Sequence, residues 1–142
     1  MAKPMQIIHG AIALMLLAVA LLHVPHPTPF IWVPYALASA LAVITVFADV
    51  GQFFARLLAI STTMLMFFFF SGFFMDVPKL ESDWYVRPEG WFAVSTLLAA
   101  FAMIPILSDY SCRCKADCMH ARAAGERVSF FRAPDHVRPP NN

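Results

Sequence analysis

The sequence predicts an all-α integral membrane protein in which four transmembrane helices form a bundle. Of its 142 residues, 60% are hydrophobic and 13% are charged, whereas a soluble domain carries about a quarter charged residues. Residues 1–75 contain only Lys3, Asp49 and Arg56 as charges, and the other sixteen of the nineteen lie in residues 76–142. Because three charges cannot cover the surface of 75 residues in water, lipid must be the solvent for most of the chain.

Four apolar stretches are each long enough to cross a membrane. They contain 17 to 20 residues, and at about 1.5 Å per residue a helix of that length crosses a hydrocarbon core of roughly 30 Å. The expected spans are residues 5–24, 30–48, 57–75 and 91–107. They define a transmembrane domain over 1–108. The tail, 109–142, is expected to form a short helix and then to be disordered or ordered only against a partner.

The distribution of basic residues predicts the orientation of these spans. The segment 76–90 carries a net charge of −2, and the tail from residue 109 carries a net charge of +2. Because basic residues favour the cytoplasmic side, both termini are expected in the cytoplasm, in a bacterial inner membrane or its equivalent. Aromatic residues that anchor helices at the opposite interface are expected at Trp32, Tyr35, Trp84 and Trp91, beside Tyr85.

The first span could instead be a cleaved signal peptide. The triplet Ala-Val-Ala at 18–20 has the small-x-small pattern of a cleavage site. The apolar run continues through Leu21, Leu22 and Val24, which favours an uncleaved membrane anchor.

The first hairpin resembles the opening hairpin of the transmembrane protein 220 family. The stretch "HGAIALMLLAVALLHVPHPTPFIWVPY" (9–35) has Gly10, Pro27 and Trp32 at the matching spacing, and Tyr35 lies within one residue of it. The family shows a Gln-x-Asn-Asp-Pro-Asp turn, and this chain departs from it at Pro25, His26 and Thr28. The resemblance covers about 27 residues and the four-span outline, and it implies a fold without a chemistry.

Two histidines in the first span suggest a haem alternative. His9 and His23 are 14 residues apart, so they project from nearly one helix face and lie roughly 21 Å apart along the axis. A helix of a di-haem cytochrome presents ligands in this way, but six-coordinate haem needs a second pair of ligands and no other predicted span contains a histidine. The simpler interpretation is that each histidine reaches water or a headgroup at its own end of the span.

Two further groups of residues could bind a metal. His23 and His26 could combine with Asp76, Glu81 and Asp83 of the second outer loop, although Pro25 breaks the helix between the histidines and solvated loop residues are the favoured interpretation. The tail string "CRCKADCMH" places four soft ligands within nine residues, and these could hold zinc or, as juxtamembrane cysteines, carry palmitate. They are Cys112, Cys114, Cys118 and His120.

The sequence lacks the residues that membrane catalysis and ion transport usually need. None of the predicted spans contains an Asp, Glu, Lys or Arg, whereas proton relays and ion pathways use such residues buried in the membrane; His9 and His23 are the only histidines there. There is no nucleophile beside a base, no phosphate-binding glycine loop and no basic patch for nucleic acid. We therefore expect a non-catalytic accessory or assembly subunit that contacts lipid and other membrane subunits, without an assigned cofactor. The alternatives are a haem or metal redox protein and a small-molecule or lipid carrier.

Overall fold

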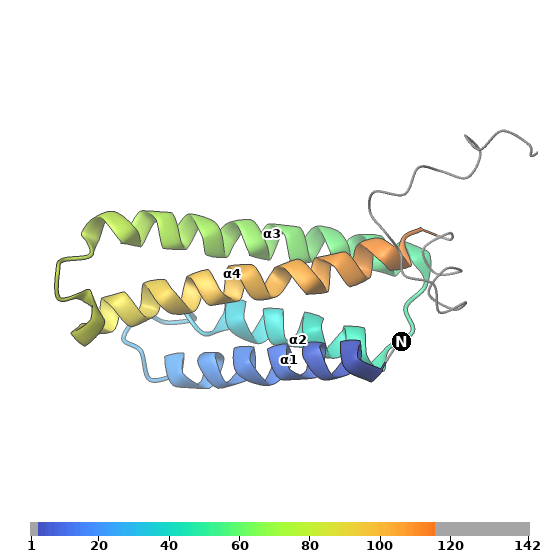
Figure 1. Cartoon of the computed structure of the whole chain (residues 1–142), viewed down its shortest axis with the longest axis horizontal. Helices are drawn as coiled ribbons and strands as arrows, with labels where there is room; N and C mark the ends of the chain where they lie inside the picture. Colours follow the sequence, from blue (N-terminus) through green and yellow to red (C-terminus); the bar gives the residue numbers. More distant parts are fainter. Residues whose placement is uncertain (1–2, 116–142) are drawn as a thin grey trace, which may run out of the picture.

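The computed structural model describes residues 3–115 of the chain, and this part is a bundle of four helices (Figure 1). The helices are α1 (Lys3–His23), α2 (Val33–Phe47), α3 (Gln52–Asp76) and α4 (Pro88–Arg113), and the short 3-10 turns η1 (Val77–Lys79) and η2 (Trp84–Val86) lie between α3 and α4. The predicted all-helical class is therefore confirmed for these residues.

Proline residues set several helix boundaries. Pro25, Pro27 and Pro29 follow the end of α1 at His23 and prevent the helix from continuing. Pro34 lies in the first turn of α2 and Pro88 is the first residue of α4, a position where its missing N–H costs nothing. Pro105 lies inside α4, and the helix continues past it to Arg113.

The second predicted span is shorter than expected. Residues 30–32 form turns and α2 begins only at Val33, so that α2 has 15 residues and α1 has 21. At 1.5 Å per residue, α2 is about 22 Å long and α1 about 31 Å. Three helical segments are long and apolar enough to cross a membrane, and α2 is a shorter apolar helix; the three are Met5–His23, Gln52–Lys79 and Pro88–Arg113.

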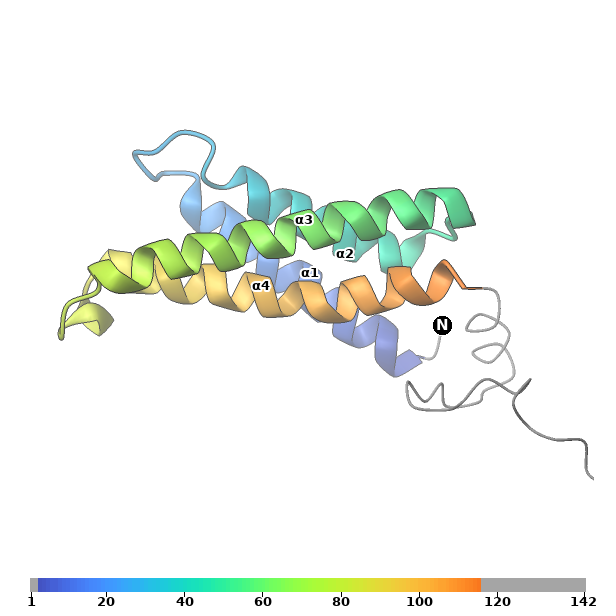
Figure 2. The ribbon, with the colours of Figure 1, turned by 90° about the horizontal axis from the view of Figure 1, so that it is seen from above.

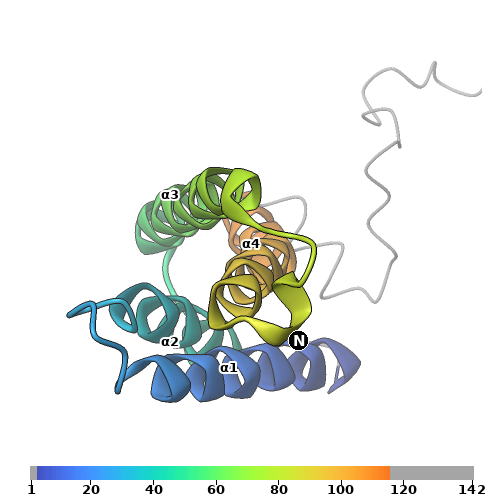
Figure 3. The same ribbon diagram turned by 90° about the vertical axis from the view of Figure 1, so that its left-hand side faces the viewer.

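The helices are arranged as two antiparallel pairs. Helix α1 packs along α2, and α3 packs along α4 (Figure 3). Seen from above, the α1–α2 pair crosses the α3–α4 pair at an angle (Figure 2). Helices α2 and α4 contact each other and both remaining helices, so they form the centre of the bundle.

The two ends of the bundle differ in their connections. The start of α1, the α2–α3 connection at 48–51 and the end of α4 lie together, and we call this the basal end (Figure 1). The connections 24–32 and 77–87 lie at the opposite end, which we call the loop end.

Small residues allow the central helices to approach closely. Many of the most buried positions of α2 and α4 are alanines, which let helix backbones pack at short range in a membrane environment where hydrophobicity alone does not drive association. These alanines are Ala38 and Ala42 on α2 and Ala93, Ala99, Ala100 and Ala102 on α4. Larger core side chains, including Leu16, Phe69, Met103 and Ile106, fill the space around this seam.

Gly90 should be a sensitive position for stability. It lies in the first turn of α4 against the backbone of Trp84, and a Cβ at this site would overlap the Trp84 carbonyl oxygen. Overpacking of this kind costs about 1–3 kcal/mol, so Gly90→Ala should lower the thermal unfolding temperature in detergent. Gly72→Ala is the matched control, because its Cβ would meet only Thr96 Cγ2, at 3.9 Å. Equal unfolding temperatures for the two variants would contradict this packing.

Candidate functional site

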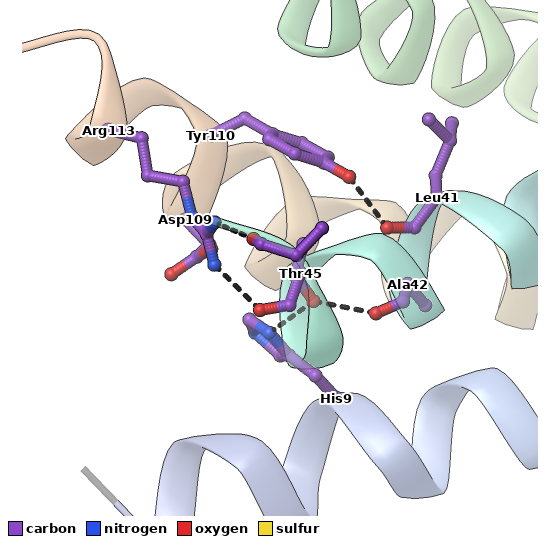
Figure 4. A network of polar contacts seen from close by, with 8 residues as sticks. His9, Leu41, Ala42, Thr45, Asp109, Tyr110 and Arg113 are labelled. Atoms are coloured by element: carbon purple, nitrogen blue, oxygen red, sulfur yellow. Dashed lines mark hydrogen bonds and ion pairs between the residues drawn. The ribbon is translucent and has the colours of Figure 1, made fainter. Parts of the chain in front are cut away.

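A network of buried polar side chains joins three helices at the basal end (Figure 4). Its members come from α1, α2 and the last turns of α4, and four of the five side chains belong to residues that are almost fully buried. They are His9 on α1, Thr45 on α2, and Asp109, Tyr110 and Arg113 on α4.

Arg113 is the centre of this network. Its Nε donates to Asp109 Oδ2 at 2.8 Å, and its two terminal nitrogens donate to the carbonyl oxygens of Ala48 and Thr45, at 2.7 and 2.6 Å. Helix α2 ends at Phe47, where the last carbonyls of a helix lack intrahelical partners and carry a partial negative charge. The guanidinium of α4 therefore caps the C-terminus of α2.

The ion pair of Asp109 and Arg113 is itself buried. The Asp109 side chain is fully buried and that of Arg113 is 8% exposed. Removing two charges from water is costly unless the geometry is good and further hydrogen bonds satisfy the groups. Here all three nitrogens of the guanidinium donate at short distance, so this pair meets that condition.

Tyr110 makes a second contact between α4 and α2. Its hydroxyl is buried and donates to the Leu41 carbonyl oxygen at 2.7 Å. A backbone carbonyl has two lone pairs and can accept this bond in addition to its helical one. Arg113 and Tyr110 thus bind α2 at points one to two turns apart.

Thr45 and His9 extend the network to α1. Thr45 Oγ1 donates to the Ala42 carbonyl at 2.7 Å, which uses the only hydrogen of the hydroxyl. The contact of 2.8 Å between Thr45 Oγ1 and His9 Nδ1 is therefore one in which His9 Nδ1–H donates. A further bond from Ser39 Oγ to the Ala13 carbonyl, at 2.9 Å, joins the same two helices.

His9 and His23, the two residues of the haem alternative, lie toward opposite ends of α1. His9 and His23 both face the interior from one side of α1, as their spacing predicts. His9 is fully buried, so the interpretation that its side chain reaches water or a headgroup is wrong for this residue, whereas His23 is partly exposed. The Nδ1 of His9 is engaged by Thr45. His23 lies at the other end of α1, with Nδ1 2.7 Å from the Val19 carbonyl and its ring 5.0 Å from that of Tyr35. The haem alternative, which assigned the two histidines to two separate haems, stays a prediction.

The predicted metal ligands do not form a cluster in the described chain. Among residues 3–115, no group of three or more His, Cys, Asp or Glu side chains is placed to hold a metal ion. His23 and His26 stack with ring centroids 6.4 Å apart. Cys112 lies in the last turn of α4 and Cys114 directly after it, while Cys118 and His120 lie outside the described residues. The tail cluster therefore stays a prediction.

The predicted aromatic belt lies at the loop end, with one correction. Trp32, Trp84, Tyr85 and Trp91 are exposed there, and Trp91 Nε1 donates to the Tyr85 carbonyl at 3.0 Å. Tyr35 instead points into the core, is 1% exposed, and lies 3.1 Å from Ser95 Oγ through its hydroxyl. Tyr35 follows Trp32 by three residues, or about one helical turn, and its side chain is buried whereas that of Trp32 is exposed.

Sequence reasoning missed the Asp109–Arg113 pair. With the fourth span ending at 107 and the domain boundary at 108, both residues were expected in the short helix of a cytoplasmic tail, but α4 continues without a break to Arg113 and the two side chains are buried in the bundle. The signal available in the sequence was the spacing of four between an acidic and a basic residue directly after an apolar helix.

The comparisons with known proteins add no further assignment. No family model matches the chain, and neither the curated proteins nor the solved structures contain a match. The fold and the site therefore define the class: a helical protein with three apolar helices of membrane-spanning length. The resemblance to the transmembrane protein 220 family stays a prediction.

Arg113 should contribute far more to stability than an exposed arginine does. Arg113→Met removes the guanidinium that faces buried Asp109 and caps α2, and breaking a buried pair costs about 3–5 kcal/mol. Arg87→Met is the matched control, because Arg87 pairs with Glu81 and Asp83 on the surface and exposed pairs contribute about 0–1 kcal/mol. Thermal unfolding in detergent measures both. Equal losses in the two variants would show that the basal pair has no special role.

Thr45 should contribute to stability through the hydrogen bond that joins its hydroxyl to His9 of α1. Thr45→Val keeps the shape and removes the acceptor of His9 Nδ1–H, which should cost about 1–3 kcal/mol. Thr62→Val is the control, since Thr62 is equally buried and its hydroxyl donates only to Leu58 of its own helix. The control should lose less stability in the same unfolding assay, and the reverse order would contradict the role of Thr45.

Proposed function

We propose that this protein is a non-catalytic subunit of a larger membrane complex, and that it packs against its partner through the outward face of α3. The observation that carries the proposal is the shallow packing of α3 in this bundle. Of its 25 residues, only Ala55, Thr62 and Phe69 are buried, whereas α4 has ten buried residues among 26. These three positions are seven residues apart and mark the line of closest contact along α3. The residues beside this line are only partly buried against the core: Leu58, Ala59, Leu65, Met66 and Phe70.

The opposite face of α3 has the pattern of a second helix–helix contact. Its exposed residues follow one another at spacings of three and four, as along a packing seam. They are Leu57, Ile60, Met64, Phe67, Ser71 and Phe74. Ser71 is the one hydroxyl in this row, and among the hydrogen bonds of residues 3–115 none involves its side chain. Such a hydroxyl can bond to a neighbouring membrane helix, which supports a protein partner over lipid alone.

The buried polar groups support a structural role over a catalytic one. Arg113, Tyr110 and Thr45 direct their hydrogen bonds to backbone carbonyls of α2. Two pockets lie at the loop end, and none of these three residues lines them. The basal network thus holds helices together, and the hydrogen-bonding groups of these three side chains are engaged by the protein.

The proposal includes an orientation. Among the described residues, the basal end has the basic residues Lys3, Arg56, Arg113 and Lys115, whereas the loop end has only Lys79 and Arg87. By the preference of basic residues for the cytoplasmic side, we place the basal end in the cytoplasm.

Site-specific photocrosslinking tests the proposal. A photoreactive amino acid at Phe67, on the outward face of α3, should give a protein adduct of defined mass in native membranes. The same residue at Leu14 is the control, because Leu14 is exposed to a similar degree on α1, and it should give no such adduct. Lipid adducts alone at both positions, together with a lone monomer in mild detergent, would overturn the proposed subunit role.

A further inference from the structure

The loop end holds two neighbouring pockets, and together they form what we call the loop-end groove. The first has a volume of about 180 Å³ and the second about 350 Å³. Both are lined by Thr28, Ile31 and Phe92, so the two pockets adjoin each other. We propose that the loop-end groove binds a phospholipid whose headgroup carries both a phosphate and a primary ammonium, as in phosphatidylethanolamine.

The first pocket provides an apolar channel. Its lining is mainly aromatic and aliphatic, with Phe68, Phe69 and Gly72 of α3 on one side and Phe30 and Pro34 on the other. Gly72 has no side chain, and a Cβ built on it would meet only Thr96 Cγ2, at 3.9 Å. This space, between α3 and the start of α2, suits an acyl chain.

Phe30, which lines the apolar channel, has an unusual backbone conformation. It has a φ of +65°, a left-handed conformation that is costly for an aromatic residue. The residue is nevertheless 73% exposed, and it lines the first pocket. Backbone strain that is retained beside a pocket is typical of residues that contact a ligand. A bound acyl chain would cover apolar surface that this residue otherwise leaves exposed.

The second pocket can bind the phosphate. Lys79 lines it, and its ammonium uses one donor on Asp76 Oδ1 at 2.9 Å, so that two of its three hydrogens remain. His26 also lines this pocket. The backbone N–H of Thr28 donates to His26 Nδ1 at 3.2 Å, which makes Nδ1 an acceptor and leaves Nε2–H as the donor of the neutral ring. A phosphate would receive hydrogen bonds from both groups.

The same pocket can bind the ammonium. Asp76 and Glu89 both line it, and Glu89 makes no ion pair within residues 3–115. A primary ammonium carries three N–H donors that can reach these carboxylates, whereas a quaternary ammonium carries none and a glycerol headgroup carries no positive charge. The paired positive and negative groups therefore favour phosphatidylethanolamine over phosphatidylcholine and phosphatidylglycerol.

Native mass spectrometry in mild detergent tests the inference on the full chain. Titration with phosphatidylethanolamine, phosphatidylcholine and phosphatidylglycerol of identical acyl chains should give at least a tenfold preference for the first. The double variant Asp76→Asn, Glu89→Gln should bind phosphatidylethanolamine about tenfold more weakly than the wild type, which is the loss expected for one charge-assisted hydrogen bond. Equal affinity of the wild-type chain for the three lipids would overturn the proposed headgroup.

A second pair of variants tests the acyl-chain channel. Gly72→Leu fills the first pocket and should weaken binding of all three lipids at least fivefold. Gly10→Leu adds the same bulk on α1 at the basal end, where a Cβ meets nothing within 4 Å, and it should bind phosphatidylethanolamine as the wild type does. Equal binding by the two variants would overturn the groove as the site. The result does not depend on the subunit role of α3, since neither crosslinking position lines the groove.

Discussion

The guanidinium of Arg113 connects the end of α4 to the end of α2, and the arrangement of the basal end depends on this contact. Hydrocarbon offers no hydrogen bonds, so each polar group that the bundle encloses must find its partner within the protein. The carbonyls of Thr45 and Ala48 and the carboxylate of Asp109 all meet this requirement through one side chain. Tyr110 and Thr45 then fix the rotation of α4 and α1 about α2.

The helical class and the positions of the helices could be predicted because lipid imposes a simple rule on composition. A run of apolar residues has to be helical in a membrane, and prolines such as Pro25 and Pro88 mark where helices stop and start. The helix boundaries were harder to predict where a helix ends in polar residues, as α4 does. Hydropathy places Asp109 and Arg113 outside the span, because it counts each charge alone and does not register that two charges four residues apart neutralise each other on one helix face.

The candidate site was predicted only in part for the same reason. His9 and His23 were correctly placed on one face of α1 from helical geometry. Their surroundings depend on side chains from α2 and α4, which lie far away in the sequence: Thr45 for His9, and Tyr35 and Phe92 for His23. A short apolar sequence carries little information about such long-range pairs. Tyr35 illustrates the difficulty, because an aromatic residue near a helix start fits both an interfacial anchor and a core position.

The capping of α2 by α4 also has a consequence for the order in which the protein is made. The carbonyls of Thr45 and Ala48 are synthesised 65 residues or more before the arginine that satisfies them. Until Arg113 has been synthesised, these two carbonyls lack the donor that they have in the complete bundle. Closure of the basal end therefore requires the whole of the bundle up to Arg113, and a chain that ends before this residue leaves the last carbonyls of α2 without the side chain that caps them.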